Sequence, residues 1–165
     1  MPIRPYRETD LDLLHAANVA SVPGVGAATR DELQTWIDLS TCFVATTETD
    51  EPLGFITLIP TGVHAYESAN LRWFEQYSDR TGKAVIYVDR IALLPEARGQ
   101  RLGEKLYQAA FAHFANLDEI GCEVNTLPPN PGSHRFHQRL GFDDAGTQVF
   151  VPGEKAVTYY VRPLK

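Results

Sequence analysis

The sequence is poor in cysteine. Among its 165 residues only Cys42 and Cys122 occur, far apart and without metal-ligand spacing. Free cysteines behave as small hydrophobic residues, so we expect both to be buried in the core. Two isolated cysteines also favour a reducing, cytoplasmic setting over a secreted disulfide scaffold.

Long apolar runs and an excess of positive charge are also missing. No run reaches the ~18 apolar residues of a membrane span, and MPIRPYRETDLDLL has no charged region followed by an apolar stretch, which predicts no signal peptide. The chain holds 15 Lys and Arg against 21 Asp and Glu, a net charge of −6. This balance argues against a general nucleic-acid or membrane-surface binder, so local groups must hold any anionic ligand.

The remaining composition suits one domain over residues 1–165, because 44% of the residues are hydrophobic and 22% are charged. Hydrophobic periodicity and turn residues mark the elements. Strands are predicted at 3–6, 41–48, 52–60, 83–95, 119–126, 146–151 and 156–164, and helices at 11–19, 29–39, 99–116 and 130–141. The aromatic segment SANLRWFEQY in 61–83 is either a helix over a cleft or ordinary packing.

Several local signals support these elements. Pro5 predicts an edge position for the first strand. Thr29 and Glu32 form a capping box, and Thr9 or Asp10 can cap the helix before it. The strand–helix–strand unit near the middle of the chain requires a parallel pair with a right-handed crossover. An α/β or α+β fold follows.

Two glycines stand near the start of a predicted helix, in PEARGQRLGEKLYQ. Gly99 and Gly103 follow the apolar run VIYVDRIALLP, although glycine costs roughly 1 kcal/mol against alanine inside a helix. A helix N-terminus leaves N–H groups unpaired and favours an anion. Arg98, Arg101 and Lys105 add positive charge. The stretch therefore predicts a pyrophosphate cradle, with a solvated helix start carrying incidental glycines as the alternative.

Two common phosphate motifs do not fit this stretch, because Glu104 follows Gly103 where a Walker loop needs Lys, and RGQRLG does not match G-x-G-x-x-G. Instead, IALLPEARGQRLGEKLYQAAF resembles the acetyl-CoA-binding signature of the GNAT superfamily of N-acetyltransferases, [QR]-x-x-G-x-[GA] after a strand ending V-x-P. Arg98, Arg101 and Gly103 fall on its three positions, and Arg101 replaces the usual central glycine.

A second stretch, NPGSHRFHQRLGF, is similar to the superfamily pattern N-x-x-A-x-x-[LF]-Y-x-x-x-G-F. The matched positions are Asn130, Ser133, Phe136, Gly141 and Phe142. The resemblance is strongest over residues 85–142 and extends to the order of elements. It implies a mixed, mostly antiparallel sheet of about six to seven strands with about four helices, splayed between strands 4 and 5.

The resemblance also implies an acetyl-CoA site. The backbone of Ile91, Ala92 and Leu93 would pair with the pantetheine arm, as an added strand does. Asn130, with Ser133 beside it, would contact the pantetheine near the sulfur, while capping of its own helix is the other role open to Asn130. The pyrophosphate would bind the amides of the turn, which belong to Arg98, Gly99, Gln100, Arg101, Leu102, Gly103 and Glu104.

Acetyl transfer to an amine needs a base, since an alkylamine is neutral in only about one molecule in a thousand at pH 7. Asp89 is the first candidate, directly or through water, and Glu123 on the next strand is the second. Pairing of Asp89 with Arg90 is the alternative to a catalytic role. A backbone N–H near Leu93 would stabilise the oxyanion.

The superfamily often places an acid tyrosine where this chain has His137. We expect His137 to protonate the leaving thiolate or to hydrogen-bond the sulfur, and a half-buried histidine lining the cleft is the alternative. Tyr107, Tyr159 and Tyr160 are expected to be packing residues, any of which can replace it as acid. His134 lies three residues before His137, but no third ligand has metal spacing, so no metal is expected.

The predicted function is an acetyl-CoA-dependent N-acetyltransferase for the primary amine of a small or amino-acid-like molecule, acting by direct attack in a ternary complex. A protein amine is a further candidate acceptor, and a homodimer is a candidate assembly. The alternative function is a non-catalytic CoA-binding regulatory or sensor module of the same fold, which the changed glycine and the missing tyrosine favour.

Overall fold

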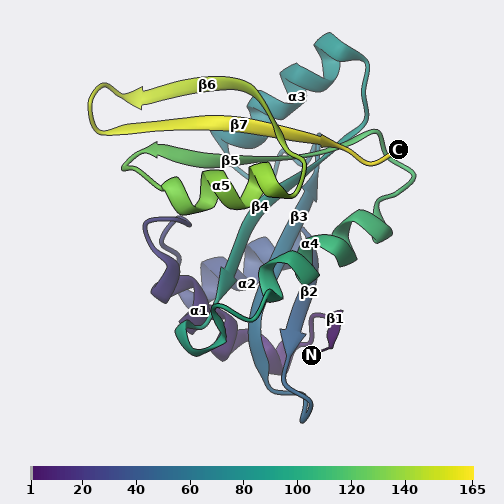
Figure 1. Ribbon diagram of the computed structural model, residues 1–165, viewed down its shortest axis with the longest axis vertical. Helices are drawn as coiled ribbons and strands as arrows, with labels where there is room; N and C mark the ends of the chain where they lie inside the picture. Colours follow the sequence, from purple (N-terminus) through teal and green to yellow (C-terminus); the bar gives the residue numbers. More distant parts are fainter. Residues whose placement is uncertain (1) are drawn as a thin grey trace.

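The computed structural model describes residues 2–165, in which seven strands form one sheet of order β1-β2-β3-β4-β5-β7-β6 (Figure 1). The strands are β1 (Ile3–Pro5), β2 (Thr41–Thr46), β3 (Pro52–Pro60), β4 (Val85–Leu93), β5 (Glu119–Leu127), β6 (Asp143–Val151) and β7 (Lys155–Pro163). The helices are α1 (Leu11–Ser21), α2 (Arg30–Asp38), α3 (Ala69–Thr81), α4 (Leu102–His113) and α5 (Pro131–Arg139).

The sheet is mixed and mostly antiparallel, as predicted. Its parallel pair is β4 and β5, joined through α4. These two strands share three residue pairs, from Val85↔Glu119 to Tyr87↔Gly121, and separate beyond Tyr87. The predicted splay between the fourth and fifth strands is therefore confirmed. The edge position expected from Pro5 is confirmed as well, because β1 is an outer strand.

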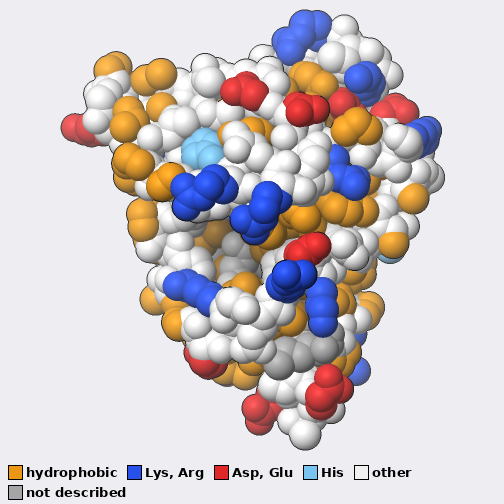
Figure 2. Space-filling view, viewed as in Figure 1, with side chains coloured by type: hydrophobic (Ala, Val, Ile, Leu, Met, Phe, Trp, Pro, Cys, Tyr) orange, Lys and Arg blue, Asp and Glu red, His pale blue; other side chains and the backbone are white. Residues whose placement is uncertain are grey.

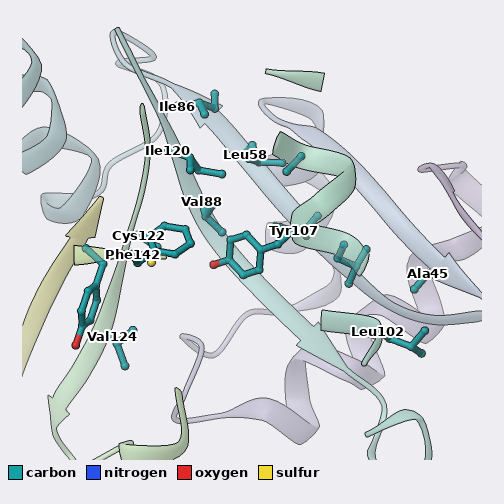
Figure 3. Close-up of a cluster of buried hydrophobic side chains, with 14 of the residues drawn as sticks. Ala45, Leu58, Ile86, Val88, Leu102, Tyr107, Ile120, Cys122, Val124 and Phe142 are labelled. Carbon is teal, nitrogen blue, oxygen red and sulfur yellow. The ribbon is translucent and has the colours of Figure 1, made fainter. Parts of the chain in front are cut away.

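Helices cover both faces of the sheet. In Figure 1, α4 and α5 lie in front of the strands, and α2 and α3 lie behind them. Alternation along each strand directs Ile86 and Val88 of β4 into the core below α4. Figure 3 shows this core, in which Tyr107 reaches from α4 toward Cys122 on β5. Both cysteines are buried, as expected.

The aromatic segment between β3 and β4 forms helix α3, where the sequence left two alternatives open. Its Trp73 ring stacks on Tyr159 of β7 with centroids 4.0 Å apart. Its Phe74 ring packs against Gly121 of β5 so closely that a side chain at Gly121 would clash with it. Both alternatives hold in part, because most of α3 is packing while Ser68 and Asn70 at its start line a cavity. The chain thus has five α-helices over residues 2–165, against the four expected.

The turn before α4 corrects a second boundary. The helix begins at Leu102 rather than at Gly99, because Gly99 and Arg101 adopt positive φ angles of 80° and 60°. Such left-handed backbone cannot continue into a right-handed helix. At the other predicted caps, the Thr29–Glu32 capping box is confirmed, whereas Asp10 makes no capping hydrogen bond and pairs with Arg4 instead.

Candidate functional site

A cavity of about 570 Å³ opens where β4 and β5 separate. Its walls come from both strands, from β7, from the start of α5 and from the loop between α1 and α2. In Figure 2 a hollow appears in the middle of the molecule, with Lys and Arg side chains gathered over α5 on one side and over the turn before α4 on the other. The predicted site residues that line the cavity are Asp89, Ile91, Arg98, Glu123, Asn130, Ser133 and His137, whereas Ala92, Leu93 and residues 99–104 do not line it.

The turn before α4 presents free backbone amides. No hydrogen bond among residues 2–165 uses the N–H groups of residues 99–104, whereas the amide of Arg98 donates to Pro95 at 3.3 Å. The guanidinium of Arg98 donates to the Ala20 carbonyl at 3.1 Å, which ties the turn to α1. Six adjacent amides at the positive end of a helix dipole make a site for an anion such as a diphosphate.

The two glycines of this turn serve different purposes. Gly99 has φ of 80° and open space around it, so its role is conformational. At Gly103 a side chain would lie 3.2 Å from the Phe136 ring, so this glycine permits close packing of α4 on α5. Arg101 keeps the left-handed conformation that the replaced glycine would adopt freely. Arg101 therefore stands in this left-handed conformation at the N-cap position of α4.

The far half of β4 offers a strand edge. Ile91, Ala92 and Leu93 pair with β3 on one side, and their other side has no partner strand, because the β5 pairing ends at Tyr87. The side chains of Ala92 and Leu93 pack into the cores on the two faces. An extended, amide-containing molecule can therefore pair with this edge as an added strand would.

A register break in β4 brings Asp89 and Arg90 together. Thr57 lies opposite Arg90 and Leu58 opposite Val88, so Asp89 is the extra residue of a bulge. The Asp89 carboxylate pairs with the Arg90 guanidinium at 2.9 Å and accepts from the Tyr66 hydroxyl at 2.7 Å.

Arg90 is held from other sides too. It donates to Asn18 of α1 at 2.9 Å and stacks over the Trp36 ring of α2. Both oxygens of Asp89 are thus engaged by groups that tie the strand to its surrounding helices. This arrangement matches the pairing alternative for Asp89 and leaves its oxygens occupied.

Glu123 lies across the opening from Asp89, on β5, and lines the same cavity. The Tyr87 hydroxyl and the Asn70 amide hydrogen-bond its carboxylate, the latter at 3.0 Å. Burial, reinforced by the negative charge of Asp89, raises the pKa of Glu123 to about 8. Glu123 is therefore ionised in about one molecule in ten at pH 7 and in half of the molecules at pH 8, and its ionised form is a stronger base than an ordinary carboxylate.

His137 does not have the environment of an acid. It is 4% exposed, and burial lowers its pKa to about 4. Its Nδ1–H donates to the Ser133 carbonyl at 2.8 Å, so Nε2 accepts from the Tyr107 hydroxyl at 2.7 Å. The imidazolium form expected from the sequence is therefore disfavoured at neutral pH. The pair of Tyr107 and His137 lines the cavity beside Cys122.

Asn130 occupies the N-cap position of α5, as predicted, but its side chain makes no capping hydrogen bond. It finds no other hydrogen-bond partner within residues 2–165, and it lines the cavity. Ser133, one turn along, lies on the same wall. The amide of Asn130 is thus available to a ligand rather than spent on its helix.

Several polar residues of the cavity were not found from the sequence, among them Tyr66, Asn70, Tyr87, Asn125 and Lys155. Tyr87 and Lys155 follow the two-residue alternation of their strands, which signals only a shared face. Asn70 belongs to the helix whose existence was left open. In the part of the chain that the structure describes, no group of three metal-ligating side chains occurs, and no helix is long and apolar enough to cross a membrane.

Comparison with solved structures shows the same architecture. The fold matches an N-acetyltransferase from Staphylococcus aureus Mu50 with a TM-score of 0.73 and 22% identity, over 99% of this chain and 98% of that chain. It matches the ribosomal-protein-S18-alanine N-acetyltransferase from Escherichia coli with a TM-score of 0.73 and 14% identity, over 99% and 93%. Arabidopsis thaliana NAA60, in complex with a bisubstrate analogue, matches with a TM-score of 0.74 and 15% identity, over 98% of this chain and 97% of that chain.

A family model extends this likeness to the sequence. The model described as "Acetyltransferase (GNAT) family" matches residues 12–142, which include the turn before α4, the separated strands and the start of α5. The match covers most of the chain and all the parts of the cavity named above except β7. With the fold and the sequence pattern in agreement, the chain belongs to the GNAT acetyltransferase family.

Proposed function

We propose that the protein transfers the acetyl group of acetyl-CoA to the primary amine of a small molecule, in a ternary complex and with Glu123 as general base. One observation carries the proposal. The gap between β4 and β5 opens directly onto a carboxyl group whose pKa is raised to about 8. Acyl transfer to an amine requires such a proton acceptor beside the reacting atoms.

The residues present fit acetyl-CoA. The amides of residues 99–104, with Arg98 beside them, would bind the diphosphate. The free edge of β4 at Ile91 would hydrogen-bond the pantetheine arm, and Asn130 would contact it from α5. Bound in this way, acetyl-CoA would supply a thioester carbonyl that is open to attack by an amine.

Glu123 would remove the proton that the attacking amine must lose. An ordinary alkylamine is protonated at pH 7, and a carboxylate held by Tyr87 and Asn70 accepts a proton without moving. As the C–N bond forms, a backbone N–H near Leu93 would stabilise the negative oxygen. The C–S bond then breaks and the sulfur leaves with the electron pair.

The Tyr107 hydroxyl would stabilise that leaving thiolate by turning its one hydrogen from His137 Nε2 to the sulfur. His137 accepts from this hydroxyl and so fixes its position at the cavity wall. Burial raises the pKa of Tyr107 well above its ordinary value, so the phenol stays protonated and acts as a donor. In this proposal His137 is a positioning residue rather than the acid. The buried thiols of Cys42 and Cys122 support a reducing, cytoplasmic setting.

Calorimetry with coenzyme A and continuous measurement of thiol release test this function. We expect CoA binding, acceptor-dependent thiol release with a panel of amines, and loss of turnover in Glu123→Gln with CoA binding retained. Binding without acceptor-dependent thiol release would favour the regulatory-module alternative. Absence of binding would overturn both.

A further inference from the structure

Lys155 opens β7 and lines the same cavity as Glu123. Along β7, Val157 lies opposite Asn125 and Tyr159 opposite Glu123. Alternation places Lys155 on the face shared by these residues. Its Nζ donates to the Asn125 side-chain oxygen at 2.6 Å. The ammonium group therefore lies near the Glu123 side of the sheet.

Lys155 forms no ion pair within residues 2–165, although its charge acts on Glu123 across the cavity. The Asn125 side-chain oxygen takes one of the three N–H donors of Lys155. The side chain is half-buried, and its positive charge lowers the pKa of Glu123. A half-buried ammonium with two unused donors in a cavity is satisfied by an anionic ligand.

The surrounding groups hold this ammonium in place. The Asn125 amide also donates to the Pro23 carbonyl at 2.9 Å, which fixes the loop between α1 and α2 against β5. Gly24 and Gly26 of this loop line the cavity. Lys155 and Asn125 thus form a rigid corner of the cavity beside the proposed base.

The spacing of the two charges limits what can bridge them. Side chains two residues apart on a strand stand about 7 Å apart, and the ammonium lies one hydrogen bond from Asn125. The gap from Glu123 to the Lys155 ammonium is therefore on the order of 5–9 Å. A molecule with its amine and carboxylate on the same carbon spans this gap with a hydrogen bond at each end.

Resting on the function proposed above, we infer that the acceptor is a free α-amino acid, whose amine faces Glu123 and whose carboxylate binds Lys155. A peptide N-terminus carries an uncharged amide where this carboxylate would lie, and a simple alkylamine carries nothing. Lys155 is thus a specificity-determining residue. It selects an acceptor by a charge that takes no part in the transfer itself.

The test compares free L-amino acids with their C-terminal amides and with the matching decarboxylated amines, as acceptors at saturating acetyl-CoA. We expect the wild type to prefer the acid form in kcat/KM by on the order of 10- to 100-fold. Lys155→Met should lose this preference through a higher KM for the acid form. Because Lys155 also lowers the pKa of Glu123, the rates on amides and amines should change too, equally for both and by less than the rate on the acid form. Lys155→Arg should keep part of it.

Lys165→Met is the matched control, because Lys165 is exposed and pairs with Asp118 at 3.3 Å. It should behave as the wild type. Equal or better wild-type turnover of amides or amines, or an unchanged acid preference in Lys155→Met, would overturn the inference. Failure of the transferase function itself gives a different result, which is no acceptor-dependent thiol release with any compound. The wild-type preference tests the inference even if a variant folds poorly.

Discussion

The hydroxyl of Tyr87 donates to both carboxylate oxygens of Glu123, at 2.9 and 2.8 Å. Tyr87 is the last residue of β4 that pairs with β5, so this contact stands at the point where the strands begin to separate. The hydrogen bond favours the ionised carboxylate, but burial outweighs it and leaves the pKa at about 8. Glu123 is therefore half-protonated at about pH 8, where a small fraction of an alkylamine has lost its proton.

Replacement of this carboxyl group tests its role. Glu123→Gln keeps the shape and can still accept from Tyr87, but it cannot take a proton. We expect kcat to fall by about 10²- to 10⁴-fold, the range of general base catalysis, with the Kd for CoA unchanged. Glu154→Gln, in the exposed turn before β7, is the control. A large loss in Asp89→Asn with near-normal Glu123→Gln would identify Asp89 as the base instead.

The raised pKa of Glu123 also predicts a pH dependence of stability. The folded state holds this proton up to about pH 8, whereas the unfolded chain releases it near pH 4.3. The free energy of unfolding therefore decreases as pH rises through this window. Glu123→Gln has no such titrating group, so its unfolding free energy relative to that of the wild type should increase by about 2–4 kcal/mol from pH 5 to pH 8. Urea unfolding of both proteins at pH 5 and pH 8 measures this change. A difference in unfolding free energy that is the same at both pH values would contradict the raised pKa of Glu123.

Tyr87→Phe tests the pKa of the proposed base, because it changes the surroundings of Glu123 and leaves the carboxyl group in place. Loss of the hydroxyl removes a hydrogen bond that lowers the pKa of Glu123, so that pKa should rise. We expect the pH at which kcat reaches half its maximum to move upward, with activity recovering at high pH. The pH profile of kcat with one acceptor measures this. A uniform loss of activity at all pH values would show that Tyr87 has a different role.

Gly99→Ala tests the turn before α4. Alanine at φ of 80° costs about 1–2 kcal/mol or displaces the free amides. We expect a lower unfolding free energy and CoA binding weakened several-fold in calorimetry. Gly153→Ala is a matched control, because Gly153 has φ of 74°, equally open space and a place in the distant β6–β7 turn. It should lose similar stability and bind CoA normally, and equal CoA affinity in both variants would remove the turn from the binding site.

His137 predicts a pH effect of the opposite sign. Its folded pKa of about 4 lies below the ordinary value of 6.5. It therefore contributes stability that is present above pH 6.5 and is lost as pH falls toward 4. Between pH 7 and pH 4.5 the wild type should lose about 2–3 kcal/mol relative to His137→Leu, because the opposite change from Glu123 is common to both proteins. Unfolding measured at pH 7 and pH 4.5 checks this, and an equal slope in both proteins would show that His137 is not the buried group responsible.

The elements and their order were largely predictable, because most of their signals are local. The Thr29–Glu32 capping box and the β-branched run of β4 depend on neighbours in the sequence. Helix α3 was harder to predict, because it is stabilised by distant residues. Trp73 stacks on Tyr159, and the Phe74 ring fits against β5 only because residue 121 is a glycine. Such pairings have no local pattern.

The choice between the two carboxylates likewise depended on tertiary contacts. The bulge at Asp89 could not be predicted from its strand, and it gives the carboxylate Arg90 and Tyr66 as partners. Glu123 gains its high pKa from burial that involves α3 and β4. The sequence identified both candidates and ranked Asp89 first, whereas the contacts and burial observed favour Glu123. Whether Glu123 is the base remains a prediction.

The short pairing between β4 and β5 has a consequence for the stability of the whole molecule. With three residue pairs between them, the two halves of the sheet are joined by little main-chain bonding. A coenzyme arm that is hydrogen-bonded along the open edge of β4 would take the place of a strand and add contacts between the two halves of the sheet. Saturating coenzyme, at 100 times its Kd, should raise the unfolding free energy by about 2.7 kcal/mol. Hydrogen exchange of the backbone amides of residues 88–93 should then be slower in the coenzyme-bound protein than in the free protein.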